Sequence, residues 1–430
     1  MLNICLVRRA FDVKHTSFNL LIVWGAALIF FSSSQLIAQE HDVLMLSTDS
    51  TLSYEKVLEH AVEHSAETIL NPGYQQQSNA YQAYGDSWFP GNRNLSVSYY
   101  DADALGSETA TEIEVNLEWE LWQWGARQQA QELGKKVSQE YQAWQRFLKY
   151  KVAGELRTVM TTLFERKLAL EQAHNNEQVA RELFDIAQQR FAKGDISKNA
   201  LLQAQGLLLD NQSARLNAEA EMIDGQRAYY YLTGLTRRPD SELLETRPQV
   251  DEIPMDHPLL VMLKSLVDTQ RSRIGVVRNA AQNKPSMSLG IRRERADSQQ
   301  SYSDSLSVGF SYPLGGSPAA LVATSDAAKA LSTAQINYEL GWRELNQQHH
   351  ELEHQLSMLN QQQQLLDERV KLNQQRANMA KVAFENGEFD IAQTVLALRD
   401  AQDAIYQLNQ LNARKQQLIS LLNQNLGILP

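Results

Sequence analysis

The same pattern of residues occurs twice in this 430-residue chain, and this duplication constrains its fold more than any other feature. Gly194 and Gly234 in the first half have counterparts in Gly387 and Gly427, and both pairs lie 193 positions apart (387 − 194 and 427 − 234). The same offset joins four further pairs of identical residues: Ala187 with Ala380, Phe191 with Phe384, Ala204 with Ala397, and Asp210 with Asp403. A fixed period of this kind indicates two copies of one structural unit.

Each half is predicted to contain the same succession of elements. A helix comes first, at about 52–84 and 257–283, and two strands joined by a polar loop follow it. A very long helix, a glycine-containing turn and a second helix complete each half. The long helices are expected because Ala, Gln, Leu and Glu dominate them, while only 20 Gly and 10 Pro punctuate the chain. We expect a first repeat at 39–234, a proline-containing linker at 235–256 and a second repeat at 257–430.

The predicted strands alternate apolar and polar residues, which gives each strand one apolar and one polar face. This pattern is expected of a sandwich edge, and equally of a membrane β-barrel with lipid outside and water inside. Aromatic residues at the strand ends fit the girdle found at membrane interfaces: Trp119, Trp122, Trp124 and Tyr312. On the barrel interpretation, six apolar strand residues face lipid: Ile113, Val115, Leu117, Leu306, Val308 and Phe310.

The number of strands requires several chains if the strands face lipid. After the first forty residues no apolar run is long enough for a spanning helix, so membrane insertion would need a β-barrel. Four strands are too few to close a barrel, because the smallest membrane barrels have about eight. Three chains would supply twelve strands. The helices carry no strict leucine heptad, and their many Ala, Gln and Asn residues favour a wide assembly with a wet lumen over a tight coiled coil.

The N-terminal segment 1–38 is predicted to be an export signal. A basic start is followed by an apolar run at 18–31 and by small residues that end at Ala38. A membrane anchor is the alternative, but the run is shorter than the ~18–20 residues that span a bilayer. The only cysteine, Cys5, lies in this segment, so the mature chain would have neither disulfides nor a thiolate metal site. The net charge of −11 argues against nucleic acid as a partner.

The strand-to-helix junction at 120–127 (ELWQWGAR), its counterpart at 312–316 (YPLGG) and the two Phe-x-x-Gly turns resemble TolC-like outer-membrane efflux proteins, the outer membrane factors. The resemblance implies a mainly α fold with a membrane β-barrel. A homotrimer would form a 12-stranded barrel in the outer membrane of a Gram-negative cell, and a long α-helical barrel would continue it through the periplasm. Such a protein is a passive conduit and not an enzyme, and it has no cofactor. Its partners are a periplasmic adaptor (membrane fusion) protein and an inner-membrane transporter.

Two segments are similar to a subgroup of this family that is paired with heavy-metal exporters of the resistance-nodulation-division type. They are His257-Pro258 and the strand 289–295 (LGIRRER). This similarity favours metal-cation efflux. Drug-exporting relatives carry acidic residues six and nine positions after the second tip glycine. Gln393 and Leu396 occupy those positions here, so we expect no acidic ring at that level.

The two glycine turns are predicted to be the ends of the helical hairpins and the docking site for the adaptor. The predicted docking residues are Lys193, Gly194, Asp195, Asn386, Gly387 and Glu388. Glycine favours the left-handed conformation that ends a helix, and Ser197 or Asp390 is placed to cap the next helix. Capping alone would also explain these residues.

A five-residue segment, His350-Glu351-Leu352-Glu353-His354, fits the H-E-x-x-H pattern of zinc proteases. His350 and His354 would share one helix face and are weak candidates for a metal site. No third ligand stands out, so we favour a polar helix segment over a protease. A periplasmic coiled-coil adaptor or scaffold is a further alternative. It would have similar helices, but it would not need amphipathic strand pairs bracketed by aromatic residues.

Overall fold

A computed structural model gives the fold of the chain. The predicted signal segment, with Cys5, lies outside the residues that the structure describes. The structure describes residues 46–101, 110–240, 242–250, 252–296 and 300–430. These belong to one compact unit, Leu44–Pro430. Among them, no helix combines the length and apolar character that crossing a membrane would need.

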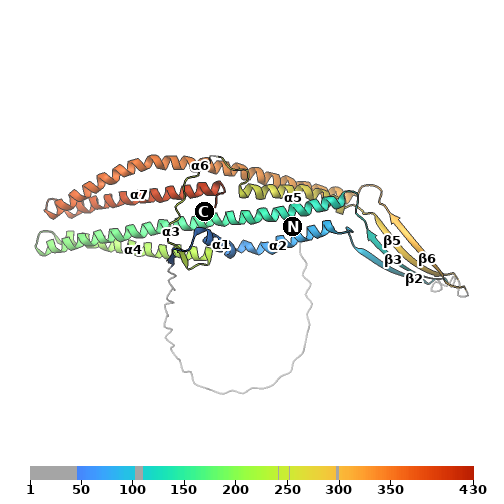
Figure 1. The fold of residues 1–430 in the computed structure, drawn as a ribbon. Coiled ribbons are helices and arrows are strands. Elements are labelled where there is room, and N and C mark those ends of the chain that lie inside the picture. Colours follow the sequence, from blue (N-terminus) through green and yellow to red (C-terminus); the bar gives the residue numbers. More distant parts are fainter. Residues whose placement is uncertain (1–45, 102–109, 241, 251, 297–299) are drawn as a thin grey trace, which may run out of the picture. The chain divides into compact units, whose positions relative to one another are not determined.

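The elements occur in the same order in each half, apart from two short strands and the division of the first helix of the first half into α1, η1 and α2 (Figure 1). The first half contains β1 (Ser47–Asp49), α1 (Tyr54–His64), the short 3-10 helix η1 (Ala66–Ile69), α2 (Leu70–Asp86), β2 (Arg93–Asp101), β3 (Thr111–Glu120), α3 (Ala126–Ala192) and α4 (Lys198–Thr233). The remainder contains β4 (Arg237–Pro239), α5 (Pro258–Ala280), β5 (Ser286–Arg295), β6 (Ser303–Ser311), α6 (Pro318–Glu385) and α7 (Ile391–Asn425). The long helices and the strands therefore lie where the alternation and the scarcity of helix breakers predict them.

The first predicted helix, at 52–84, is wrong as a single element. It ends at His64, and Ser65 adopts an extended conformation before η1 and α2 begin. An unbroken helix would place Pro72 in its interior, where the ring would clash with the carbonyl of Thr68. Restarting the helix at Leu70 puts Pro72 in the first turn, where proline is tolerated.

The linker between the halves also differs from the irregular segment that its prolines indicate. Its strand β4 pairs in parallel with β1, so that Ser47 lies opposite Arg237. The Arg237 guanidinium also forms an ion pair with Asp49, at 2.9 Å. These contacts join the beginning of the first half to the chain that leaves it.

One antiparallel sheet contains both hairpins, in the strand order β2-β3-β5-β6. Val115 of β3 lies opposite Val97 of β2 on one side and Ile291 of β5 on the other. The central pair β3-β5 thus joins the two halves of the chain, while β2 and β6 form the edges.

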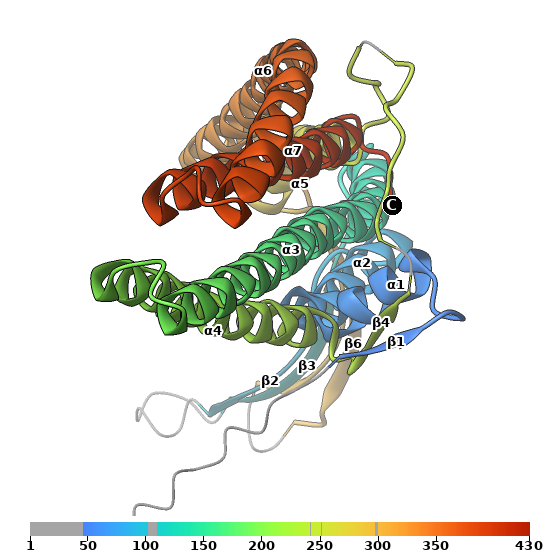
Figure 2. The same cartoon turned by 90° about the vertical axis from the view of Figure 1, so that its left-hand side faces the viewer.

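Four helices form a layer that leads away from the sheet. Helix α3 packs on α4, α6 packs on α7, and α3 and α7 join the two hairpins. The order across the layer is therefore α6, α7, α3, α4, as the view in Figure 2 shows. Helices α2 and α5 pack on the strand-proximal part of α3, and a core that includes Val57, Trp144 and Leu156 lies beneath them.

Candidate functional site

One face of the sheet is apolar and open. The register places its side chains in cross-strand rows, such as Leu95, Leu117, Leu289 and Val308. All six residues predicted to face lipid lie on this face and are exposed, from 38% for Ile113 to 69% for Leu306. A contiguous exposed apolar surface of this kind marks a contact with a membrane or with another protein.

The opposite face of the sheet is polar and carries a column of carboxylates on β3. Glu112 pairs with Arg292 at 2.7 Å, and Glu120 pairs with Lys284 at 2.7 Å. Glu114 and Glu118 have no ion-pair partner among the described residues. Ser288 and Gly309 lie beside Glu118, and Arg292 lies opposite Glu114 in the register. Small polar side chains beside carboxylates suit a surface that faces water.

Aromatic side chains collect where the sheet meets the helices. Trp124 lies in the turn before α3 and is fully exposed, and Tyr312, which follows β6, is also exposed. Trp122 is half-buried, and its indole Nε1 donates to the carbonyl of Ser87 at 3.1 Å. Of the predicted girdle, Trp124 and Tyr312 are thus the more open residues.

The two predicted hairpin tips have one geometry. Gly194 and Gly387 both have φ = 81°, the left-handed conformation that favours glycine. The amide of Asp195 donates to the carbonyl of Arg190 at 2.9 Å, and the amide of Glu388 donates to the carbonyl of Ala383 at 2.8 Å. These six-to-one bonds are those of Schellman C-caps.

Side-chain caps begin the helix after each tip. Ser197 Oγ accepts from the amide of Ala200 at 3.2 Å, and Asp390 Oδ1 accepts from the amide of Gln393 at 2.8 Å. The capping function predicted for these residues is confirmed. The six residues predicted to dock the adaptor are all exposed.

The structure brings the two tips together. Arg190 near the first tip donates to the carbonyl of Phe384 near the second at 2.7 Å, and its guanidinium lies 4.9 Å from the centre of the Phe384 ring. Beneath them, Leu183, Ala204 and Ile391 form a small shared core. The exposed turns therefore sit on one packed end.

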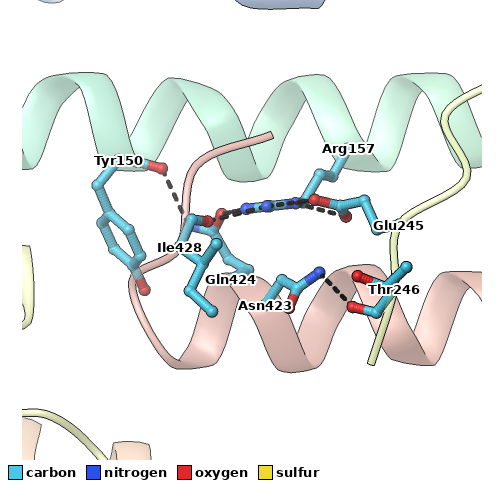
Figure 3. Close-up of polar contacts among 7 residues, drawn as sticks. All are labelled: Tyr150, Arg157, Glu245, Thr246, Asn423, Gln424 and Ile428. Atoms are coloured by element: carbon cyan, nitrogen blue, oxygen red, sulfur yellow. Dashed lines mark hydrogen bonds and ion pairs between the residues drawn. The ribbon is translucent and has the colours of Figure 1, made fainter. Parts of the chain in front are cut away.

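A buried ion pair lies midway along α3 and was not predicted from the sequence (Figure 3). Arg157 is 1% exposed, and its Nη2 lies 2.6 Å from Glu245 Oε1 of the linker. The same guanidinium donates to Gln424 Oε1 of α7 at 2.5 Å and to the carbonyl of Ile428 at 2.9 Å. One side chain thus joins α3, the linker and the end of α7.

Three consecutive amides in the last turn of α7 extend this network in different directions. Asn423 donates to the carbonyl of Thr246 in the linker at 3.2 Å, and Gln424 donates to the carbonyl of Tyr150 in α3 at 2.9 Å (Figure 3). Asn425 donates to the carbonyl of Leu345 in α6 at 3.0 Å. We call Arg157, Glu245, Asn423, Gln424 and Asn425 the polar hub.

His257 lies beside the polar hub at the start of α5. Its ring is 1% exposed and packs edge-on to the Tyr150 ring at 4.9 Å. Nδ1 accepts from the amide of Leu259 at 3.2 Å, which caps the helix. Burial lowers the pKa of His257 to about 4, because desolvation penalises the charged ring. His257, which belongs to a segment similar to the metal-exporter subgroup, therefore caps α5 and packs against Tyr150.

The H-E-x-x-H segment lies on α6 with both candidate metal ligands, His350 and His354, exposed to solvent. Glu353 instead forms an ion pair with Arg247 of the linker at 2.6 Å. The buried histidine of this stretch is His349, whose Nδ1 lies 3.2 Å from Asn425 Oδ1. Within the described ranges, no group of three or more His, Cys, Asp or Glu side chains is placed to hold a metal ion.

No known family model matches the sequence, and no curated protein matches it. Solved structures match the fold. CusC matches with a TM-score of 0.70 at 15% identity, over 89% of this chain and 93% of that chain. VceC, an outer membrane protein of Vibrio cholerae, matches with a TM-score of 0.70 at 12% identity, over 87% of this chain and 95% of that chain. The CmeC outer membrane channel of Campylobacter jejuni matches with a TM-score of 0.65 at 16% identity, over 87% and 85%. The chain has the fold of TolC-like outer-membrane channels.

Proposed function

We propose that the chain is the outer-membrane channel of a tripartite efflux system. The observation that carries this proposal is the open apolar face of the sheet, backed by a polar face with a carboxylate column. Lipid on one side and water on the other would satisfy both faces. The fold shared with the CmeC outer membrane channel and with VceC supports the same function.

In this proposal three copies close a 12-stranded β-barrel, and their helices form a helical barrel in the periplasm. Support comes from the edges of the four-stranded sheet, because β2 and β6 have one strand neighbour each among the described strands. Pairing β6 of one copy with β2 of the next would remove both edges. Each half of the chain would then be one outer-membrane efflux repeat, with boundaries at 39–234 and 257–430.

The exposed tips around Gly194 and Gly387 would meet a periplasmic adaptor and an inner-membrane transporter. Both turns lie at the ends of α3 and α6 farthest from the sheet (Figure 1). If the sheet lies in the outer membrane, helices of 67 and 68 residues would carry the tips about 100 Å from it. The partner pump would supply the energy, since the chain itself would be a passive conduit and not an enzyme.

Cationic cargo, metal ions included, is the class that we favour. Glu114 and Glu118 would face the water-filled passage without an ion-pair partner among the described residues. Three copies would repeat these carboxylates around the passage. The resulting negative potential would raise the local concentration of cations.

An arginine substitution on the apolar face tests the proposal. Val115→Arg or Val308→Arg should reduce assembly in the outer membrane, because an arginine facing lipid at the bilayer midplane costs about 2–4 kcal/mol. Glu114→Gln, on the polar face of the same strand as Val115, should assemble normally. The measurement is the amount of protein in detergent extracts of outer-membrane fractions. A protein that stays in the soluble periplasmic fraction would support a coiled-coil scaffold instead, and equal assembly of all three variants would contradict the lipid-facing surface.

A further inference from the structure

The apolar face of the sheet carries two arginines at the end farthest from the helices (Figure 1). Arg293 and Arg295 lie at the end of β5. In the register Arg293 lies opposite Ile113, one of the six residues predicted to face lipid. Arg295 lies two positions further along the same face, opposite Thr111. An arginine that faces hydrocarbon is costly at the bilayer midplane, and the cost falls near the interface. Two arginines on this face therefore suit the surface of a membrane.

One aromatic ring contacts both arginines. Tyr302 lies just before β6, and its ring centre is 5.1 Å from the Arg293 guanidinium and 5.0 Å from that of Arg295. Both distances are those of cation-π contacts. Because guanidinium groups repel each other, a ring that contacts both of them concentrates positive charge at one place. We call Arg293, Arg295 and Tyr302 the arginine clamp.

The acidic residue beside the arginine clamp neutralises only part of its charge. Asp304 of β6 lies opposite Arg293, and its Oδ1 is 3.2 Å from Arg293 Nε. Arg295 has no ion-pair partner among the described residues. Its Nη2 donates to Thr111 Oγ1 at 3.5 Å, which is long for a hydrogen bond. The Arg295 guanidinium is therefore placed to bind an anion.

Other carboxylates at this end of the sheet contact different groups. Asp101, at the end of β2, accepts from the Tyr99 hydroxyl at 3.2 Å. On the polar face, Arg292 forms ion pairs with Glu112 and Glu294, both at 2.7 Å. The two faces of β5 thus differ, because the arginine of the polar face has two carboxylate partners and the two arginines of the apolar face share one.

Aliphatic side chains continue the apolar face next to the arginine clamp. Ile291 lies two positions before Arg293 on β5 and opposite Leu306 of β6. Both are open to solvent, with exposed fractions of 59% for Ile291 and 69% for Leu306. A ligand with an anionic head and a hydrocarbon chain would match the cations with its head and the aliphatic surface with its chain.

We propose that the arginine clamp binds a phosphate monoester of a lipid in the outer leaflet, and that an acyl chain of this lipid covers Ile291 and Leu306. The inference rests on the membrane-embedded sheet proposed above, in which the helices lead inward and the arginine clamp lies at the outer end. A phosphate monoester carries a charge of about −1.5 to −2 at neutral pH and three acceptor oxygens. Two guanidinium groups match this charge, and each can donate two parallel hydrogen bonds. The phosphate diester of an ordinary phospholipid has a single charge and matches them less well.

Binding of lipid A, an acylated glucosamine disaccharide with two phosphate monoesters, tests the proposal. The detergent-extracted protein is incubated with lipid A, and the bound lipid is measured by native mass spectrometry. Arg293→Gln combined with Arg295→Gln should weaken binding at least tenfold, because both cations are lost. Arg292→Gln, on the polar face of the same strand, is the matched control and should bind like the natural protein.

A second comparison uses the natural protein alone and so does not depend on the folding of a variant. Lipid A without its phosphates, and phosphatidylglycerol, should each bind at least tenfold more weakly than intact lipid A. Either lipid binding as tightly as lipid A, or equal binding of lipid A by the natural protein and the double variant, would overturn this inference and leave the channel intact. Natural protein that stays in the soluble periplasmic fraction would overturn both proposals.

Discussion

The contact between α3 and α7 and the exposed apolar residues of α4 and α6 occupy equivalent positions in the two halves, but their chemistry differs. Glu165 and Gln172 of α3 correspond to Met358 and Leu365 of α6. Grooves of about 440 and 340 Å³ run beside the contact between α3 and α7, whereas Leu202, Leu209 and Leu216 of α4 are exposed apolar residues. The contact between α3 and α7 joins parts of one chain, so it is intramolecular and needs little interaction energy.

The polar hub also differs between the two halves, because a buried charged residue in the first half corresponds to an exposed residue in the second. Arg157 is buried against Glu245, while the position 193 residues later is His350, which is exposed. In the first half, the side chain at this position contacts the linker and the end of α7. In the second half, the side chain at this position is exposed to solvent. The burial of equivalent positions therefore differs with the segments that lie beside them.

The largest effect that we expect comes from breaking this ion pair. Arg157→Met leaves the Glu245 carboxylate buried without its cation and should lower the free energy of unfolding by about 3–5 kcal/mol. His350→Ala, at the equivalent exposed position, should change it by less than about 0.5 kcal/mol. Thermal unfolding of the detergent-extracted protein measures both. Equal stability of the two variants would show that the buried ion pair contributes no more to the free energy of unfolding than the exposed histidine does.

A smaller effect concerns His257, which is buried in the second half while its counterpart His64 is exposed. Its pKa is about 4 in the folded chain, below the usual 6.5. The unfolded chain therefore binds a proton that the folded chain does not as pH falls from about 6.5 to about 4. Stability that is complete above pH 6.5 should fall by about 2 kcal/mol at pH 5.

His257→Gln removes this titration and is the matched control. Unfolding curves of the variant and of the natural protein at pH 7 and pH 5 should show a smaller pH difference for the variant. An identical difference would mean that other groups cause the loss.

The smallest effect that we expect distinguishes the two hairpin tips. Valine at Gly194 or Gly387 would have to adopt φ near +81°, which costs about 1–2 kcal/mol. A side-chain carbon at Gly387 would also lie 3.4 Å from Arg190 Nη2, whereas nothing lies within 4 Å at Gly194. We expect intact trimers from both variants, with weaker adaptor crosslinking and export, and the greater loss in Gly387→Val.

Adaptor capture at the natural level by both variants, alone and combined, would contradict docking at the tips. The proposal that the chain is a conduit would not be affected by that result. Loss of the trimer in either variant would instead assign the turn to assembly.

The sequence predicts the elements whose signals are local. Alternation over 111–121 identifies the face that carries Val115, and the glycine offset identifies both tips. Arg157 could not be assigned in this way, because an arginine in a helix rich in Gln and Glu is indistinguishable from a solvated one. Its burial depends on the linker and on the end of α7, which are distant in sequence.

The exposed apolar residues along α4 could not be predicted for a related reason. The helices carry no continuous leucine heptad, and three leucines at 202, 209 and 216 carry information only when α4 is known to lie at an edge. The order α6, α7, α3, α4 is a property of the tertiary packing. The break after His64 was missed because the apolar pattern continues across it, although Pro72 was a signal for it.

The pairing of β3 with β5 also determines the order in which the chain can fold. Thr111 lies opposite Arg295, and Glu120 lies opposite Ser286, so the centre of the sheet forms only after most of the chain has been synthesised. The hairpin α3-α4 depends on nearby residues and can form early. Meanwhile the first strand pair presents its apolar face without neighbours, a state that favours aggregation. A long-lived intermediate of this kind would need a holding chaperone.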